Sequence, residues 1–144
     1  MRRLHRRGSV ALLIAALVGA CVLVGPGAAP AAAGTTNCGI PRWQLLDHDY
    51  PVRSIDWYGR HLVLENLQIA DYSYAKITSG YHSGDRVWVD RSSNGGGSWF
   101  QCGPFSDYRS RMLDNLHYWM RACLDVVVSG QRRHACTSWY YDAS

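Results

Sequence analysis

Two cysteines near the C-terminus, Cys123 and Cys136, constrain the fold more than any other feature of the sequence. They lie thirteen positions apart, with a Ser-Gly dipeptide midway between them. If they face each other across an antiparallel hairpin, the strands are joined by a two-residue loop, Ser129-Gly130, a common kind of tight connection. The cysteines then form a non-hydrogen-bonded pair with Cα atoms about 4.5 Å apart. That distance suits a disulfide, so we predict a stapled hairpin.

Other uses of these cysteines fit the sequence less well. Zinc and redox sites commonly take cysteines from CxxC-like motifs, and the sequence has none. The four cysteines after residue 33 allow three pairings. The hairpin pairing leaves Cys38 to bond with Cys102. A helix over residues 108–128 would remove the basis of this assignment.

The first 33 residues have the pattern of a secretory signal peptide. Four arginines come first, an apolar run extends from Val10 to about Val24, and small residues follow. We predict cleavage after Ala33, a single secreted β-domain of residues 34–144, and no membrane attachment after cleavage. The alternative is lipoprotein processing at Cys21, because the sequence "VGAC" resembles a lipoprotein cleavage site.

The charge balance argues against a nucleic-acid partner. The chain has fifteen basic and eleven acidic side chains, and four of the arginines belong to the predicted signal. Removing them leaves eleven basic residues against eleven acidic ones, so the basic isoelectric point belongs to the export signal. The remaining 111 residues fit one domain.

Several short runs predict strands, and together they predict an all-β fold, a small disulfide-stapled two-layer sandwich. In "DRVWVDR", Arg86, Trp88 and Asp90 point to one face, and Val87 and Val89 to the other. The strand runs are residues 61–69, 71–81, 85–91, 98–101 and 117–128. The stretch 108–128 also shows apolar residues at helical spacing, so a short helix near 107–115 is the alternative.

The hairpin register also assigns side chains to faces. On the face away from the core it places Trp119 opposite Tyr140, Arg121 opposite Ser138, and Asp125 opposite His134. The predicted core face carries Tyr118, Met120, Ala122, Leu124, Val126, Ala135, Thr137, Trp139 and Tyr141. We interpret Asp125 and His134 as a surface ion pair, and a base with its orienting carboxylate is the alternative.

Four residues on polar strand faces are candidates for ligand binding: Trp88, Trp119, Arg121 and Tyr140. Flat aromatic rings beside charged groups suit sugars, since the ring faces stack on C–H groups while polar neighbours bond hydroxyls. The alternative interpretation is that these aromatics pack at the core or its rim.

The stretch "SSNGGGSW" fits the pattern S-x-[DN]-x-G-x-[ST]-W and resembles the Asp-box of sialidases and related β-proteins, with Asn94 where that family usually has Asp. The resemblance implies a structural hairpin turn built by Ser92, Asn94, Gly96 and Trp99, and it implies no catalysis. Glycines permit positive φ and Asn and Ser brace turns, which agrees.

Residues 84–99, with "RAC" at 121–123 and "CTSW" at 136–139, also resemble a small module of secreted proteins from high-GC Gram-positive bacteria. That module occurs alone or C-terminal to glycoside hydrolases. The resemblance implies secretion and β-structure, and it carries no catalytic residues to this chain.

We therefore predict a secreted non-catalytic domain that binds carbohydrate or a cell-envelope polymer, without metal or cofactor. The first alternative is a secreted protein-binding or inhibitory domain that uses loop 80–84 or 103–109. A small hydrolase using Asp47, His48 or His134 is a further alternative. Asp47, His48 and Asp49 could ligate a metal, but we interpret "LDHDYP" as a polar loop because no second ligand pair is evident.

Overall fold

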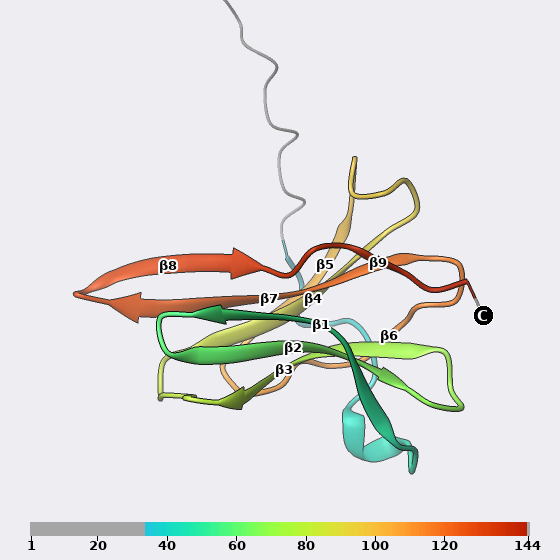
Figure 1. Ribbon diagram of the computed structural model, residues 1–144, viewed down its shortest axis with the longest axis horizontal. Helices are drawn as coiled ribbons and strands as arrows, with labels where there is room; N and C mark the ends of the chain where they lie inside the picture. Colours follow the sequence, from blue (N-terminus) through green and yellow to red (C-terminus); the bar gives the residue numbers. More distant parts are fainter. Residues whose placement is uncertain (1–33, 144) are drawn as a thin grey trace, which may run out of the picture.

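Two antiparallel β-sheets stack face to face in the computed structural model, which describes residues 34–143 (Figure 1). The predicted signal peptide and Cys21 lie outside the described residues. The prediction of a disulfide-stapled all-β fold is confirmed. In chain order the elements are the 3-10 turn η1 (Arg42–Gln44) and the strands β1 (Asp49–Trp57), β2 (Arg60–Leu67), β3 (Tyr72–Ser79), β4 (Arg86–Ser92), β5 (Phe100–Phe105), β6 (Leu113–Asp114), β7 (Trp119–Val128), β8 (Gln131–Cys136) and β9 (Tyr140–Tyr141).

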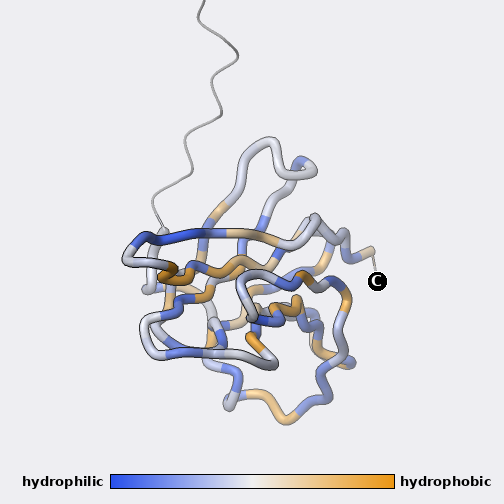
Figure 2. Tube along the Cα trace, turned by 60° about the vertical axis from the view of Figure 1, so that its left-hand side comes forward, coloured by the Kyte–Doolittle hydropathy of each residue, from blue (hydrophilic) through white to orange (hydrophobic). Residues whose placement is uncertain are grey.

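The core lies between the two sheets. One sheet has the order β1-β2-β3-β6, and the other has β5-β4-β7-β8 with β9 added alongside β7. Figure 2 shows the hydrophobic stretches of the chain concentrated where the sheets face each other. Fully buried side chains from both sheets fill this space: Leu62, Leu64, Ala75, Ile77, Val87, Val89, Met120, Ala122, Leu124 and Val126. Within residues 34–143 no helix is long and apolar enough to span a membrane.

The sequence pattern did not predict β1. This strand pairs with β2 at the edge of its sheet, and its register shifts between Pro51 and Arg53. Proline lacks the N–H that a ladder needs, so it is tolerated at edges and bulges. The bulge interrupts the alternation of inward and outward side chains, which is the signal that marks a strand in a sequence.

The stapled hairpin predicted for β7 and β8 is confirmed. Cys123 pairs with Cys136 in the expected register, and their Cα atoms lie 4.0 Å apart. The connecting Ser129 and Gly130 both have positive φ, 50° and 74°, as a tight hairpin turn matched to strand twist requires. The second disulfide, Cys38–Cys102, is also as predicted and ties the N-terminal segment to β5.

Beyond Cys136 the predicted register is wrong by one residue. Thr137 N donates to Ala122 O, but Ala122 N donates to the Thr137 side-chain Oγ1 instead of its carbonyl. The side chain thus replaces a ladder bond and lets the chain leave the sheet, after which Tyr140 pairs with Met120. Trp139 consequently turns away from the core.

The alternative of a short helix near 107–115 is not found. Residues 108–112 instead run extended beside β3, where Ile77 N donates to Tyr108 O at 2.7 Å and Ser110 N donates to Ala75 O at 2.9 Å. Backbone groups that would form a helix are therefore used by the edge of the sheet.

A buried polar network fixes the C-terminal end of the domain. Asp142 Oδ2 accepts hydrogen bonds from the side-chain amides of Asn66, at 2.9 Å, and Asn115, at 2.8 Å. Asn115 also donates to Ser73 Oγ, which in turn donates to Asn66 Oδ1. The network links β9 to β2 and β3 and so connects the two sheets at this end.

Candidate functional site

The outer face of the five-stranded sheet carries an open depression of about 630 Å³. Its floor comes from alternate residues of β4 and their cross-strand neighbours on β7, because every second side chain of a strand points to the same face. Trp88 pairs with Cys123 and Asp90 pairs with Arg121. The complete lining is Trp88, Asp90, Trp99, Gln101, Arg121, Asp125, Arg132, His134, Ala135 and Cys136.

Arg121 is held in a sandwich between two tryptophans. Its guanidinium carbon lies 4.7 Å from the ring centroid of Trp99 and 4.4 Å from that of Trp139. Its Nε donates to Asp90 Oδ2 at 2.8 Å. A cation over an indole face is attracted by the ring quadrupole, so the stacked rings and the carboxylate together fix the arginine in one orientation. We call Asp90, Trp99, Arg121 and Trp139 the arginine clamp.

The turn between β4 and β5 positions the clamp. Ser92 Oγ accepts hydrogen bonds from the N–H groups of Asn94, at 3.2 Å, and Gly96, at 2.9 Å, while Asn94 Oδ1 accepts from Ser98 N. The side chains of Ser92 and Asn94 thus bond the backbone of the turn. Gly96 has a φ of 95°, and a Cβ there would lie 2.3 Å from Trp139 Nε1. The turn therefore positions Trp99 against Arg121, and the absence of a side chain at Gly96 leaves space for the Trp139 ring.

Burial changes the pKa of the Asp90 carboxyl group. Its side chain is 1% exposed. Burial raises the pKa of Asp90 to about 6, even though hydrogen bonds from Arg121 and Trp88 favour the ionised form. Among residues 34–143, Asp90 Oδ1 has no hydrogen-bond partner. The depression thus has a carboxylate oxygen with spare accepting capacity just beneath its surface.

A second buried carboxylate lies at the other end of the depression, and here a prediction needs correction. Asp125 faces His134 across the hairpin as expected, but within the described chain the two form no ion pair. Asp125 Oδ2 instead accepts from Arg86 and, at 3.4 Å, from Arg132. Arginine outcompetes histidine because it is always charged and presents several donors in a planar fork.

The one group of potential metal ligands in the described part of the chain cannot act as such. Asp90, Cys123 and Cys136 each place a ligand atom within 4.8 Å of the others. Both sulfurs, however, belong to the disulfide. Zinc binds thiolates, and a disulfide offers none.

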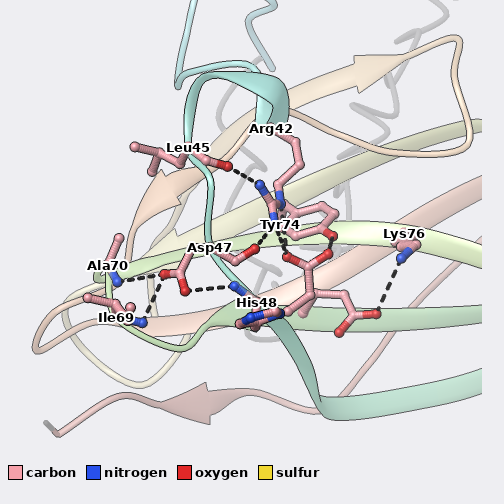
Figure 3. Close-up of polar contacts among 10 residues, drawn as sticks. Arg42, Leu45, Asp47, His48, Ile69, Ala70, Tyr74 and Lys76 are labelled. Atoms are coloured by element: carbon pink, nitrogen blue, oxygen red, sulfur yellow. Dashed lines mark hydrogen bonds and ion pairs between the residues drawn. The ribbon is translucent and has the colours of Figure 1, made fainter.

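The "LDHDYP" segment packs as a structural unit (Figure 3). Asp47 Oδ2 accepts from the backbone N–H groups of Ala70 and Ile69, and these bonds hold the pKa of Asp47 below its usual value. Asp49 accepts from Arg42 Nε at 2.8 Å and from the Tyr74 hydroxyl. Both carboxylates are thus occupied within the described residues. The interpretation of the whole segment as a polar loop is wrong for its second half, because Asp49 to Pro51 already belong to β1 and pair with β2.

The structure brings together two of the four predicted ligand residues. Trp88 and Arg121 lie in the depression, and neither Trp119 nor Tyr140 lines it. Trp119 packs against Tyr141 with ring centroids 5.1 Å apart, and Tyr140 packs against the core.

Two aromatic residues of the arginine clamp were not among the predicted ligand residues: Trp99, which lines the depression, and Trp139, which stacks on Arg121. Trp99 was predicted as part of the turn, and the turn pattern was the signal that could have placed it on this face. Trp139 was assigned to the core because the register change at Thr137 has no signature in the sequence.

Comparisons with known proteins assign no family to the chain. No family model, curated protein or solved structure matches it.

Proposed function

We propose that this chain is a secreted, non-catalytic domain that binds carbohydrate, and that the depression on the outer face of the five-stranded sheet is the binding site. The observation that carries the proposal is the arginine clamp beside Trp88, at the centre of an open and otherwise polar surface. The proposed ligand is a glycan or cell-envelope polymer.

The chemistry of the depression suits a polyhydroxylated ligand. Exposed edges and faces of indole rings stack on the C–H faces of sugars, and carboxylate and guanidinium groups bond hydroxyls as acceptors and donors. Asp90 and Asp125 each keep one oxygen without a hydrogen-bond donor among residues 34–143, but both oxygens are buried, so the accessible polar groups for a ligand come from the other lining side chains, such as Arg132 and His134. Because Arg121 is already oriented by its neighbours, little side-chain entropy is lost when a ligand binds it.

A pull-down against insoluble polysaccharides and peptidoglycan tests the proposal. We expect retention on at least one polymer, and we expect Trp139→Ala and Arg121→Gln to reduce it at least tenfold. Trp43→Ala is the matched control, because Trp43 is 71% exposed and belongs to η1, away from the depression. Thermal unfolding of each variant establishes that it is folded.

Two results would end the proposal. One is the absence of retention on every polymer tested. The other is retention by folded Trp139→Ala and Arg121→Gln proteins that equals that of the unaltered chain.

A second candidate function, binding of a secreted protein, is favoured by one specific observation. The two loops predicted as contact segments, 80–84 and 103–109, meet in the structure: the rings of Tyr81 and Tyr108 lie 6.2 Å apart in an edge-on arrangement. Both tyrosines are about 40% exposed. Tyrosine is enriched in protein interfaces because it offers a large contact area with few rotatable bonds.

An inhibition panel against secreted proteases separates the two functions. Nanomolar inhibition that is lost in Tyr81→Ala or Tyr108→Ala, and kept in Trp139→Ala, would favour protein binding. No inhibition together with polymer retention would favour the glycan site.

A further inference from the structure

A second cavity lies on a different part of the molecule, between η1 and the chain that follows β5. It has a volume of about 340 Å³ and shares no lining residue with the depression. Its lining is Pro41, Arg42, Phe105, Ser106, Asp107, Arg109, Ser110 and Arg111. Three arginines therefore meet at one small hollow.

The backbone explains why two of these arginines share the cavity. Residues 108–112 run extended, bonded on one side to β3 and on the other to Ile40 through Met112. Side chains two residues apart on an extended segment point to the same side. Ser110 and Met112 are thus turned inward and buried, while Arg109 and Arg111 reach the cavity.

The two arginines differ from the others in the described chain. Eight of the ten arginines in residues 34–143 donate a hydrogen bond to a protein oxygen, and the guanidiniums of Arg109 and Arg111 donate none. No carboxylate of the described residues lies within 4.0 Å of either one. Their charges at the cavity are therefore without a bonded counterion in this part of the chain.

Aromatic rings nevertheless hold both guanidiniums in place. Arg109 lies over the ring of Tyr108 at 5.3 Å, and Arg111 lies over Phe105 at 5.9 Å. Stacking on a ring uses the flat face of the guanidinium and leaves its edge, where all five N–H donors point, available for another partner. These donors make no hydrogen bond within residues 34–143 and are available to a ligand.

The other charged residues of the cavity are already engaged. Arg42 makes four hydrogen bonds, to Asp49 and to the carbonyls of Leu45 and Asp47, and its charge is balanced by the Asp49 carboxylate (Figure 3). Asp107 Oδ1 accepts from the N–H of Tyr108 at 2.6 Å. The cavity therefore keeps a net positive character.

We propose that Arg109 and Arg111 form a binding site for an oxyanion, the phosphate or carboxylate group of an anionic ligand. Guanidinium edges pair with the oxygens of such groups through two parallel N–H···O bonds, which are stronger than bonds between neutral groups. The Ser106 hydroxyl lines the cavity, makes no hydrogen bond to the part of the chain that the structure describes, and supplies a further donor. The site is independent of the proposed function, since it shares no residue with the arginine clamp.

Titration of ¹⁵N-labelled protein covering residues 34–144 with inorganic phosphate, galacturonate and chloride tests the site at constant ionic strength. We expect saturable shifts of the Arg109 and Arg111 Nε–H signals with a dissociation constant on the order of 1–10 mM for phosphate, galacturonate or both, and none for chloride. The stronger of the two probes identifies the source of the oxyanion.

Variants make the assignment specific. We expect Arg109→Gln and Arg111→Gln each to weaken binding about tenfold, and Arg111→Lys to weaken it less because the charge remains. Arg133→Gln is the matched control: Arg133 is exposed, its guanidinium bonds only Gln131, and it lies outside the cavity. Shifts that do not saturate, or an affinity unchanged in both glutamine variants, would overturn the proposal.

Discussion

The domain buries two carboxylates in opposite settings, Asp142 at the end that joins the sheets and Asp90 on the outer face. Asp142 is bonded by two neutral amides, that of Asn66 from β2 and that of Asn115 from the segment after β6. Asp90 is paired with a single arginine, and its pKa is raised. One of its oxygens has no hydrogen-bond partner among residues 34–143. Asp142 thus helps to hold the two sheets together, whereas Asp90 lines the depression that we propose as the ligand site.

The largest effect is expected from Asp142→Ala. The substitution leaves the buried amides of Asn66 and Asn115 without their shared acceptor, so we expect the free energy of unfolding to fall by about 3 kcal/mol. Urea denaturation measures this change. Asp56→Ala is the control, since the Asp56 side chain is 83% exposed, and it should cost less than about 0.5 kcal/mol. If the free energy of unfolding falls by less than about 1 kcal/mol in Asp142→Ala, the Asp142 carboxylate does not have the structural role that distinguishes it from Asp90.

The second effect is a pH dependence of stability to which the buried carboxyl of Asp90 should contribute most. Its pKa is raised from an ordinary value of 3.8 to about 6. Between these values the folded state binds more protons than the unfolded state, so the free energy of unfolding decreases as pH rises, on the order of 1–3 kcal/mol in total. Burial also raises the pKa of Glu65, which acts in the same direction.

Denaturation of the unaltered chain and of Asp90→Asn from pH 3.5 to 7.5 isolates this contribution. The difference between the two profiles should follow a titration centred near pH 5 to 6, because Glu65 and all other groups are common to both proteins. Parallel profiles would show that Asp90 ionises in the folded protein as it does in the unfolded chain.

The third effect concerns the turn that supports the clamp. We expect Gly96→Ala to cost about 1–2 kcal/mol, because its φ of 95° is unfavourable for alanine and its Cβ would collide with Trp139. Gly95→Ala shares the positive φ but meets no atom within 4 Å. Gly95→Ala should therefore cost about 1 kcal/mol and keep polymer retention, while Gly96→Ala should lose polymer retention. Equal retention by the two variants would show that the arginine clamp is not needed for binding.

The smallest effect is expected from Arg132→Ala at the rim of the depression. The side chain is 47% exposed, and its contact with Asp125 is 3.4 Å long while Arg86 remains in place. An exposed ion pair contributes little, so the free energy of unfolding should change by less than about 1 kcal/mol. A larger loss in urea denaturation would mean that Asp125 depends on both arginines, as a buried carboxylate would.

The stapled hairpin and most of the sheet structure could be predicted from the sequence. Cysteine spacing, turn residues and alternating side chains are local signals, and they gave the register of Cys123 with Cys136 and the outward face of Trp88. β1 and the segment 107–115 could not be identified this way, since a bulge at Pro51 and pairing along the edge of β3 depend on neighbours distant in the sequence.

The site was predictable only in part for the same reason. Trp88 and Arg121 follow from strand alternation. Trp139 contacts Arg121 because the Thr137 hydroxyl, and not the Thr137 carbonyl, accepts the hydrogen bond from Ala122 N, and the strand register changes there. The composition of the sequence does not show which of the two oxygens accepts this bond. Shifting a strand by one residue exchanges its two faces, so the register change beyond Cys136 leaves Trp139 on the outer face, beside Arg121.

The tryptophan indole N–H signals offer the most direct test of the central claim that the arginine clamp binds the ligand. Six tryptophans report on separate parts of the domain during titration with soluble oligosaccharides of the retained polymer. We expect the signals of Trp88, Trp99 and Trp139 to shift together and saturate, with Trp43, Trp57 and Trp119 unchanged. Shifts confined to Trp43 or Trp119, or no shift of any of the six, would contradict the assignment.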